Sequence, residues 1–311
     1  MEVLVRLGVR VFVRAFERAV GMAAIGGRAL LPIASAILLV SLAREAGAQS
    51  TGPVTTPSVA TASAATSTVT STAPTPAPLN LPFDSLRASI DRALIASKPA
   101  DYERALALID GALAQRPDDA VLLHYRGFLL YREGSYLVTT GREVARAKSR
   151  FEEAERVLAR SAATLKWPET LALQSAVVGQ LIALGGPLAG MRLGAKTSRL
   201  LDEALAAGPE NPRVWMLKGV SDLYRPKLFG GSTEKAEASL TRALALFASD
   251  APTPPAPWWG HAEAYGWLGQ VYMKEGKTEQ AKAAYAKALD LQPGNTWVLE
   301  LLLPAVRPTP R

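Results

Sequence analysis

The stretch AYGWLGQVYMKEGKTEQAKAAYAKALDLQPGN, residues 264–295, decides the fold of this chain. Its apolar and small residues recur every three or four positions on both sides of Gly276, a spacing that places side chains on one face of an α-helix. Gly276 interrupts the pattern and Pro293 ends it, so the stretch predicts a hairpin of two helices. The residues expected to pack the two helices together are Tyr265, Leu268, Gly269, Tyr272, Ala281, Tyr285 and Ala288.

This hairpin resembles a tetratricopeptide repeat over its whole length, with Tyr265 where that family usually has Trp. Gly269 and Ala288 stand where two helices should touch, because small residues let backbones approach closely. One hairpin cannot bury its own apolar face, so the resemblance implies stacked neighbours. Similar second-helix endings do recur along the chain, as GALAQRP, EALAAGP, RALALFA and KALDLQP, at residues 111–117, 203–209, 242–248 and 287–293.

We therefore expect an all-α fold, a right-handed α-solenoid of about five helical hairpins followed by a C-terminal capping helix. Gly127 and Gly219 are the small crossing residues of two further hairpins. No stretch alternates at period two between turn signals, so strands are not expected. The expected helices cover residues 83–96, 102–115, 120–132, 143–160, 169–184, 197–207, 213–224, 234–247 and 296–306, with connections at 135–142, 185–194 and 225–232.

The first 48 residues have the order of an export signal. Arg28 precedes an apolar core of about 15 residues, and small residues at Ala46 and Ala48 follow it. We expect translation to start at Met1 or Met22 and cleavage after Ala48, which would make the protein periplasmic. In the alternative, an uncleaved leader anchors the protein in the inner membrane.

Residues 49–80 contain no charged residue and consist almost wholly of Thr, Ser, Ala, Pro and Val. Such a composition cannot form a packed core and predicts a disordered linker. The helical repeat domain is therefore expected to occupy residues 81–311. That part carries 29 Lys and Arg against 25 Asp and Glu, because the first 80 residues hold 6 of the 35 basic and 3 of the 28 acidic residues. A net charge of +4 without a basic stripe argues against a nucleic-acid partner.

Few residues suited to catalysis or metal binding are present. The chain has no Cys, which excludes disulfides and a lipid-modified Cys, and only two histidines, His124 and His261. Neither His has a second ligand one helical turn away, so no metal site is expected. Each is a candidate general base, but a packed or groove-lining role suits its apolar surroundings better. We expect no cofactor and no enzymatic activity.

The resemblance also implies a binding surface. In tetratricopeptide repeats the first helix of each hairpin lines a concave groove, and the positions that match it here are His124, Phe128, Tyr131, Met216, Val220, Leu223, Gln270 and Met273. Because these residues are mainly aromatic and aliphatic, they predict an apolar protein segment or a small apolar ligand as the occupant. In the alternative, inserted segments starting at Ser135, Gly185 or Arg225 cover this face, and the same residues become core.

A second, shorter resemblance involves RPKLFGG, residues 225–231, which is similar to a segment of exported bacterial repeat proteins, including the T component of TRAP-type transporters. This chain lacks the lipoprotein Cys of that group. Two functions are therefore expected. The first is a periplasmic scaffold that binds a protein partner in its groove, and the alternative is a transporter accessory that binds a small apolar solute.

Overall fold

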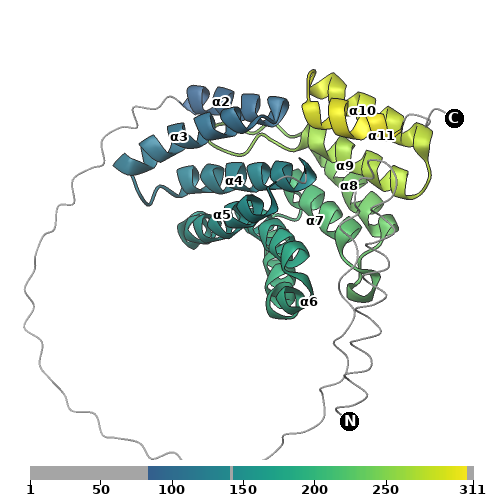
Figure 1. The fold of residues 1–311 in the computed structure, drawn as a ribbon, viewed down its shortest axis with the longest axis horizontal. Helices are drawn as coiled ribbons and strands as arrows, with labels where there is room; N and C mark the ends of the chain where they lie inside the picture. The colour runs from purple at the N-terminus through teal and green to yellow at the C-terminus, as the bar shows by residue number, and fades with distance from the viewer. Residues whose placement is uncertain (1–82, 141–142, 307–311) are drawn as a thin grey trace, which may run out of the picture. The chain divides into compact units, whose positions relative to one another are not determined.

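The computed structural model of the chain describes residues 83–140 and 143–306, so the expected leader (1–48) and linker (49–80) lie outside the described residues. Within these ranges the secondary structure is helical and contains no strand (Figure 1). Each helix from α2 to α10 packs against the next helix in sequence. The expectation of an all-α solenoid is therefore confirmed.

In the described part of the chain, residues 83–140 and 143–306, the helices form five successive hairpins. They are α2 (Phe83–Ala96) with α3 (Pro99–Gln115), α4 (Ala120–Thr140) with α5 (Val144–Thr164), the two arms of α6 (Pro168–Ala207), α7 (Pro212–Tyr224) with α8 (Thr233–Phe247), and α9 (His261–Lys274) with α10 (Thr278–Leu291). A short 3₁₀ helix, η1 (Lys227–Phe229), lies between α7 and α8. Local signals set several helix starts: the Asn211 side chain caps α7 and the Ser232 side chain caps α8, since each accepts hydrogen bonds from backbone N–H groups of the first turn.

Helix α6 is two antiparallel arms rather than one continuous rod. Gly186 has φ 69° and ψ −159°, a backbone conformation that only glycine adopts readily. The Ser175 hydroxyl donates to the Thr197 carbonyl at 2.8 Å, although 22 residues of straight helix would span about 33 Å. The expected connection at 185–194 is thus wrong: the chain turns at Gly186, and the second arm is helical from Pro187 onward.

The expected long turn at residues 135–142 is also wrong over 135–140, because α4 continues to Thr140. Gly134 does not break the helix there. A Cβ at Gly134 would lie 2.7 Å from the Phe151 ring, so glycine is needed for close packing of α4 on α5. Leu137, one turn further on, is buried and fixes the extension in the core.

Three glycines mark close helix crossings. A Cβ at Gly127 would meet Leu158, one at Gly219 would meet Leu240, and one at Gly269 would overlap the ring of Tyr285. Gly127, Gly219 and Gly269 are the same small residues that the sequence predicted at helix crossings. The other residues assigned to packing in the last hairpin lie as follows: Leu268, Ala281, Tyr285 and Ala288 are buried, Tyr265 and Tyr272 are half-buried, and Pro293 is exposed just after α10.

The C-terminal segment covers the last hairpin. It consists of a π-helix, η2 (Trp297–Leu302), and a short helix, α11 (Leu303–Ala305), in place of one regular helix over 296–306. Val298 and Leu302 pack on the apolar face of α10 that Tyr285 occupies. This covering is what a capping element provides to a solenoid whose last repeat would otherwise expose its core.

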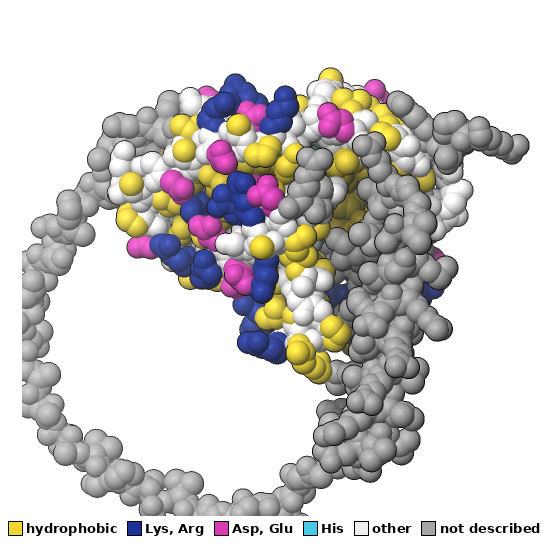
Figure 2. All heavy atoms as spheres, in the orientation of Figure 1, with side chains coloured by type: hydrophobic (Ala, Val, Ile, Leu, Met, Phe, Trp, Pro, Cys, Tyr) yellow, Lys and Arg dark blue, Asp and Glu magenta, His cyan; other side chains and the backbone are white. Residues whose placement is uncertain are grey.

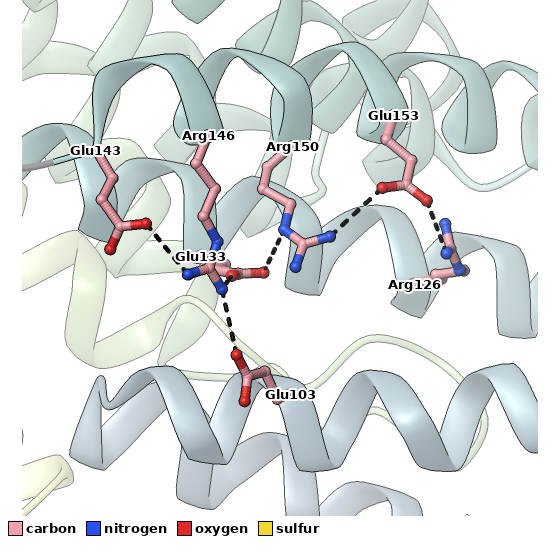
Figure 3. Close-up of polar contacts among 7 residues, drawn as sticks. All are labelled: Glu103, Arg126, Glu133, Glu143, Arg146, Arg150 and Glu153. Carbon is pink, nitrogen blue, oxygen red and sulfur yellow. Dashed lines mark hydrogen bonds and ion pairs between the residues drawn. The ribbon is translucent and has the colours of Figure 1, made fainter.

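Ion pairs tie α3, α4 and α5 together around one buried carboxylate (Figure 3). Glu133 of α4 is 1% exposed and pairs with Arg146 at 2.8 Å and with Arg150 at 2.9 Å, both from α5. Arg146 also reaches Glu103 of α3 at 3.3 Å. A buried carboxylate is tolerated only when it is paired, so this cluster fixes the register of the three helices.

Candidate functional site

Most of the predicted groove residues are buried. His124, Phe128, Tyr131, Met216, Val220 and Leu223 are at most 9% exposed, whereas Gln270 and Met273 are half-buried. In this structure the first six side chains belong to the core and do not line an open groove. The expectation of an exposed groove is corrected accordingly, because a segment that the sequence analysis did not consider covers this face.

The covering segment is the connector, residues 248–260, which joins α8 to α9. The Trp259 ring stacks on the Phe128 ring, with centroids 4.6 Å apart and planes 15° from parallel. The Tyr125 hydroxyl donates to the Pro255 carbonyl at 2.6 Å. The inserted segments at Ser135, Gly185 and Arg225 were expected to provide this cover; at Phe128 the connector provides it instead.

Trp258 extends the contact to the first helix. Its ring lies edge-on to Phe83, with centroids 5.7 Å apart, and its indole N–H donates to Asp91 at 2.7 Å. The Arg87 guanidinium lies 4.9 Å from the centroid of the same ring. We call Phe83, Tyr125 and Phe128 the aromatic face. The connector thus lies along this face of α2 and α4 and is held there by stacking, a cation–π contact and two hydrogen bonds.

The local sequence explains why the connector is extended. In APTPPAP, residues 251–257, four prolines remove four backbone N–H groups and fix φ, so a helix cannot form. A stiff proline-rich segment loses little entropy on docking against aromatic rings. No role was assigned to this stretch from the sequence. The signal that could have identified the site is the adjacent pair Trp258 and Trp259, because two consecutive large aromatic residues are seldom left in solvent.

An ion pair lies at each end of the connector and holds the chain in place there. Arg213 of α7 is 2% exposed and pairs with Asp250 at 2.6 Å, and its guanidinium lies 5.4 Å from the Phe247 ring centroid. At the other end, Glu263 of α9, also buried, pairs with Arg132 of α4 at 3.6 Å. These pairs connect α7 and α9 to the same region that the connector occupies.

The two histidines differ in environment. His124 is fully buried, and its Nδ1 lies 2.9 Å from the Thr170 hydroxyl. Burial, and secondarily the charge of Arg213, lowers the pKa of His124 to about 3, so the ring is neutral at pH 7 and serves as a packed residue. His261 is half-buried and stacks between Phe247 and Tyr265. Burial lowers its pKa as well.

We expect His124 to make the folded state sensitive to acid. Its folded pKa lies below the unfolded value of 6.5, so its contribution to stability is complete above pH 6.5 and is lost as the pH falls toward 3. Between pH 6.5 and 5 the loss should be about 2 kcal/mol. Urea unfolding of the wild type and of His124→Gln at pH 7 and pH 5 measures this loss of stability. The variant should lose less stability than the wild type, and His261→Gln, which removes a half-buried His whose pKa is also lowered, should reduce the loss by a smaller amount. Equal losses in wild type and His124→Gln would contradict the assignment.

Within residues 83–140 and 143–306 no group of three His, Asp or Glu side chains is placed to hold a metal ion. A shallow surface depression lies where α6 and α7 begin, and its lining includes Pro168, Asn211, Arg242 and Asp250. It contains none of the predicted groove residues.

Large apolar side chains are exposed at two hairpin turns. Leu188 and Met191, beside the turn of α6, are 69% and 55% exposed, and Leu228 and Phe229 of η1 are 61% and 45% exposed. Figure 2 shows hydrophobic surface at the free end of α6 with Lys and Arg beside it. Sequence reasoning placed the binding surface elsewhere and did not identify these positions.

A stack of helical hairpins, each packed on the next and closed by a cap, defines a helical-repeat protein. Residues 262–295, which contain α9 and α10, match the family model of the tetratricopeptide repeat. Residues 262–295 are therefore a tetratricopeptide repeat, and the stacked hairpins around it have the helical-repeat fold.

Similar solved structures include the HusA haemophore from Porphyromonas gingivalis, with 25% identity and a TM-score of 0.51, over 61% of this chain and 92% of that chain. Another is a thermophilic tetratricopeptide repeat protein of Thermus thermophilus, with 22% identity and a TM-score of 0.45, over 72% of this chain and 97% of that chain. No curated protein matches the chain in sequence.

Proposed function

We propose that the protein is a non-enzymatic scaffold that binds a protein partner. Tetratricopeptide repeats bind protein segments along the faces of their helices, and the fold alone supports this coarse function. The observation that carries the finer proposal is the connector on the aromatic face. An extended chain rich in Pro and Trp already occupies that face, so the face has the shape and chemistry to hold such a chain. A partner segment of the same kind would bind there in exchange for the connector.

The exchange requires that the connector compete with the partner. A tethered segment competes at an effective concentration of about millimolar, so a partner segment binds the wild type weakly until the connector is loosened. A substitution at Trp258 should weaken the binding of the connector to the aromatic face. The ring of Trp258 is only half-buried, and it contacts Phe83, Tyr125, Asp91 and Arg87. Phe128 stacks on Trp259 instead, so the removal of Trp258 should leave the packing of Phe128 intact.

A labelled synthetic peptide with the sequence APTPPAPWW tests the proposal by fluorescence anisotropy. Trp258→Ala should bind it about tenfold more tightly than the wild type, because the internal competitor is weakened. Trp215→Ala is the matched control, since Trp215 is a half-buried Trp that packs under Arg242 and donates to the Pro209 carbonyl, and its ring does not contact the aromatic face. Equal binding by all three proteins, or binding by none, would contradict the proposal that a partner segment binds the aromatic face. Mass spectrometry of proteins captured from an envelope fraction by Trp258→Ala would then identify the partner.

A second candidate is the binding of a small apolar ligand, as in the transporter accessory expected from the sequence. The likeness to a haemophore favours it, and a flat aromatic ligand would suit the stacking surface of Phe128 and Tyr125 if the connector moved away. Titration with haem, followed by its absorbance band, tests this candidate on the wild type and Trp258→Ala. A saturable spectral change that is larger in the variant would support it, and an unchanged spectrum in both would exclude haem.

We further propose that the scaffold acts in the periplasm. The order of basic region, apolar core and small residues before Gln49 supports export. N-terminal sequencing of the protein expressed from its full gene should find Gln49 at the first position. A membrane-bound protein that begins at Met1 or Met22 would instead show an uncleaved anchor.

A further inference from the structure

The α6 tip, residues 179–199, has an unusual composition. Arg192, Lys196 and Arg199 are its only charged residues, and no Asp or Glu occurs anywhere between residues 170 and 201. The rest of the tip consists of Leu, Ile, Ala, Gly, Met and Pro with three uncharged polar residues, and it has no aromatic residue. The tip is therefore apolar and positively charged.

Leu181 and Leu184 pack against the edge of the core, but the rest of the tip is left outside it. No residue from 179 to 199 is buried, and Leu188 and Met191 are more than half exposed. The base of the hairpin is different, because Leu173 and Val177 of the first arm and Ala204 of the second are buried in the main core. The hairpin is thus anchored at its base and free at its apex.

The length of the arms explains why the apex projects. The Asn211 amide donates to Glu169 at 2.7 Å, which places the start of α7 beside the start of α6. From there residues 168–185 extend about 27 Å, whereas α7, with 13 residues, extends about 20 Å. The first arm therefore reaches several ångströms further than its neighbour, and Figure 1 shows α6 reaching away from α5 and α7.

We propose that the α6 tip inserts its apolar apex into the surface of an anionic phospholipid membrane. Leu188, Met191 and Pro187 would enter the boundary between headgroups and acyl chains, and Arg192 and Arg199 would lie against the phosphates. Lys196 pairs with Glu155 of α5 at 2.5 Å and so contributes less to the attraction.

Other occupants suit the tip less well. A second copy would bring two sets of basic residues together, with no acidic residue on either tip to compensate for them. A protein interface usually centres on aromatic anchors, which the tip lacks. By length and composition α6 could cross a membrane, but it folds back at Gly186 and its base lies in the core, so the membrane contact is confined to the apex.

The absence of Cys from the chain permits a position-specific test. Leu188→Cys and, as the matched control, Leu291→Cys would be labelled with an environment-sensitive dye such as NBD in the full-length protein. Leu291 is 44% exposed and lies on α10, away from the tip. With vesicles of equal parts phosphatidylglycerol and phosphatidylcholine, the dye at position 188 should shift to the blue and brighten severalfold, while the dye at 291 should not change. Because both proteins carry the same residues 1–82, any contact made by that segment affects them equally.

Two variants separate the apolar and electrostatic contributions. Leu188→Glu with Met191→Glu should weaken the membrane partition of the tip, measured by vesicle co-sedimentation, about tenfold or more. Arg192→Gln with Arg199→Gln should weaken it about fivefold for each charge removed, and only on anionic vesicles. Circular dichroism verifies the fold of both variants, which is expected to persist because Leu188, Met191, Arg192 and Arg199 are exposed. No dye response at position 188, an equal response with pure phosphatidylcholine, or a response that requires an added envelope protein would overturn the proposal.

Discussion

Phe128→Ala is expected to lower the free energy of unfolding by about 3–5 kcal/mol, the largest effect of any single substitution considered for this chain. Phe128 is 1% exposed, and its ring stacks on Trp259 of the connector. Truncation would leave a cavity between α4 and the connector that the surrounding helices could fill only in part. Urea or thermal unfolding followed by circular dichroism measures the loss.

Phe229→Ala is the matched control, because Phe229 is 45% exposed in η1 and its truncation should change stability by less than about 0.5 kcal/mol. The pair also tests the sequence-based hypothesis of an open groove. If Phe128→Ala were as stable as the wild type and lost only partner binding, Phe128 would line a groove, and the covered aromatic face would not represent the protein in solution.

Gly269→Leu is expected to destabilise the fold by about 1–3 kcal/mol through overpacking. Even the Cβ of a new side chain would overlap the ring of Tyr285, which is 1% exposed and has no free space to enter. The hairpin of α9 and α10 would have to separate, and the cap that packs on Tyr285 would move with it. Denaturant unfolding monitored by Trp fluorescence would measure the change.

The control for this effect is Gly111→Leu on α3, where an added Cβ meets no atom within 4 Å. There the substitution should stabilise the helix slightly, since glycine is a poorer helix former than leucine by about 0.5–1 kcal/mol. Lys282→Ala should be nearly silent, because Lys282 pairs with the exposed Glu279 on the surface of α10. Similar small effects for Gly269→Leu and Gly111→Leu would contradict the close helix crossing.

Local sequence signals predicted the ends of helices correctly where a glycine or proline ends the helix, as at Gly276 and in the turn before η1. They failed where glycine has a packing role. The helix was expected to end at residue 132, but Gly134 gives space to the Phe151 ring, and the helix continues to Thr140. Glycines 190 and 194 were assigned to a connection, yet they lie within the second arm of α6. A glycine that allows close approach and a glycine that breaks a helix are the same letter in a sequence.

The candidate site was misplaced for a different reason. Large uncharged residues on one face of a first helix suit an open groove and a covered core equally well, so periodicity could select Phe128 and Tyr131 without revealing their exposure. The exposure of Phe128 depends on Trp259, which lies more than 120 positions further along the chain. Only the three-dimensional arrangement brings the connector to α4. The exposed apex of α6 was missed because residues 185–194, which include Leu188 and Met191, were assigned to a connection between helices.

The connector and the C-terminal segment join parts of the chain that are far apart in sequence. The hydrogen bond from Tyr125 to Pro255 spans 130 residues, that from Trp258 to Asp91 spans 167, and that from the Thr296 hydroxyl to the Ile95 carbonyl spans 201. In an open repeat array each unit contacts only its neighbours, so folding nucleates anywhere and units fray from the ends. Here α2 packs on α3, but its contacts with Trp258 and Thr296 form only when the connector and the C-terminal segment are in place. The repeats should therefore unfold in one cooperative transition, refold slowly for an all-helical protein, and tolerate the loss of neither terminal hairpin.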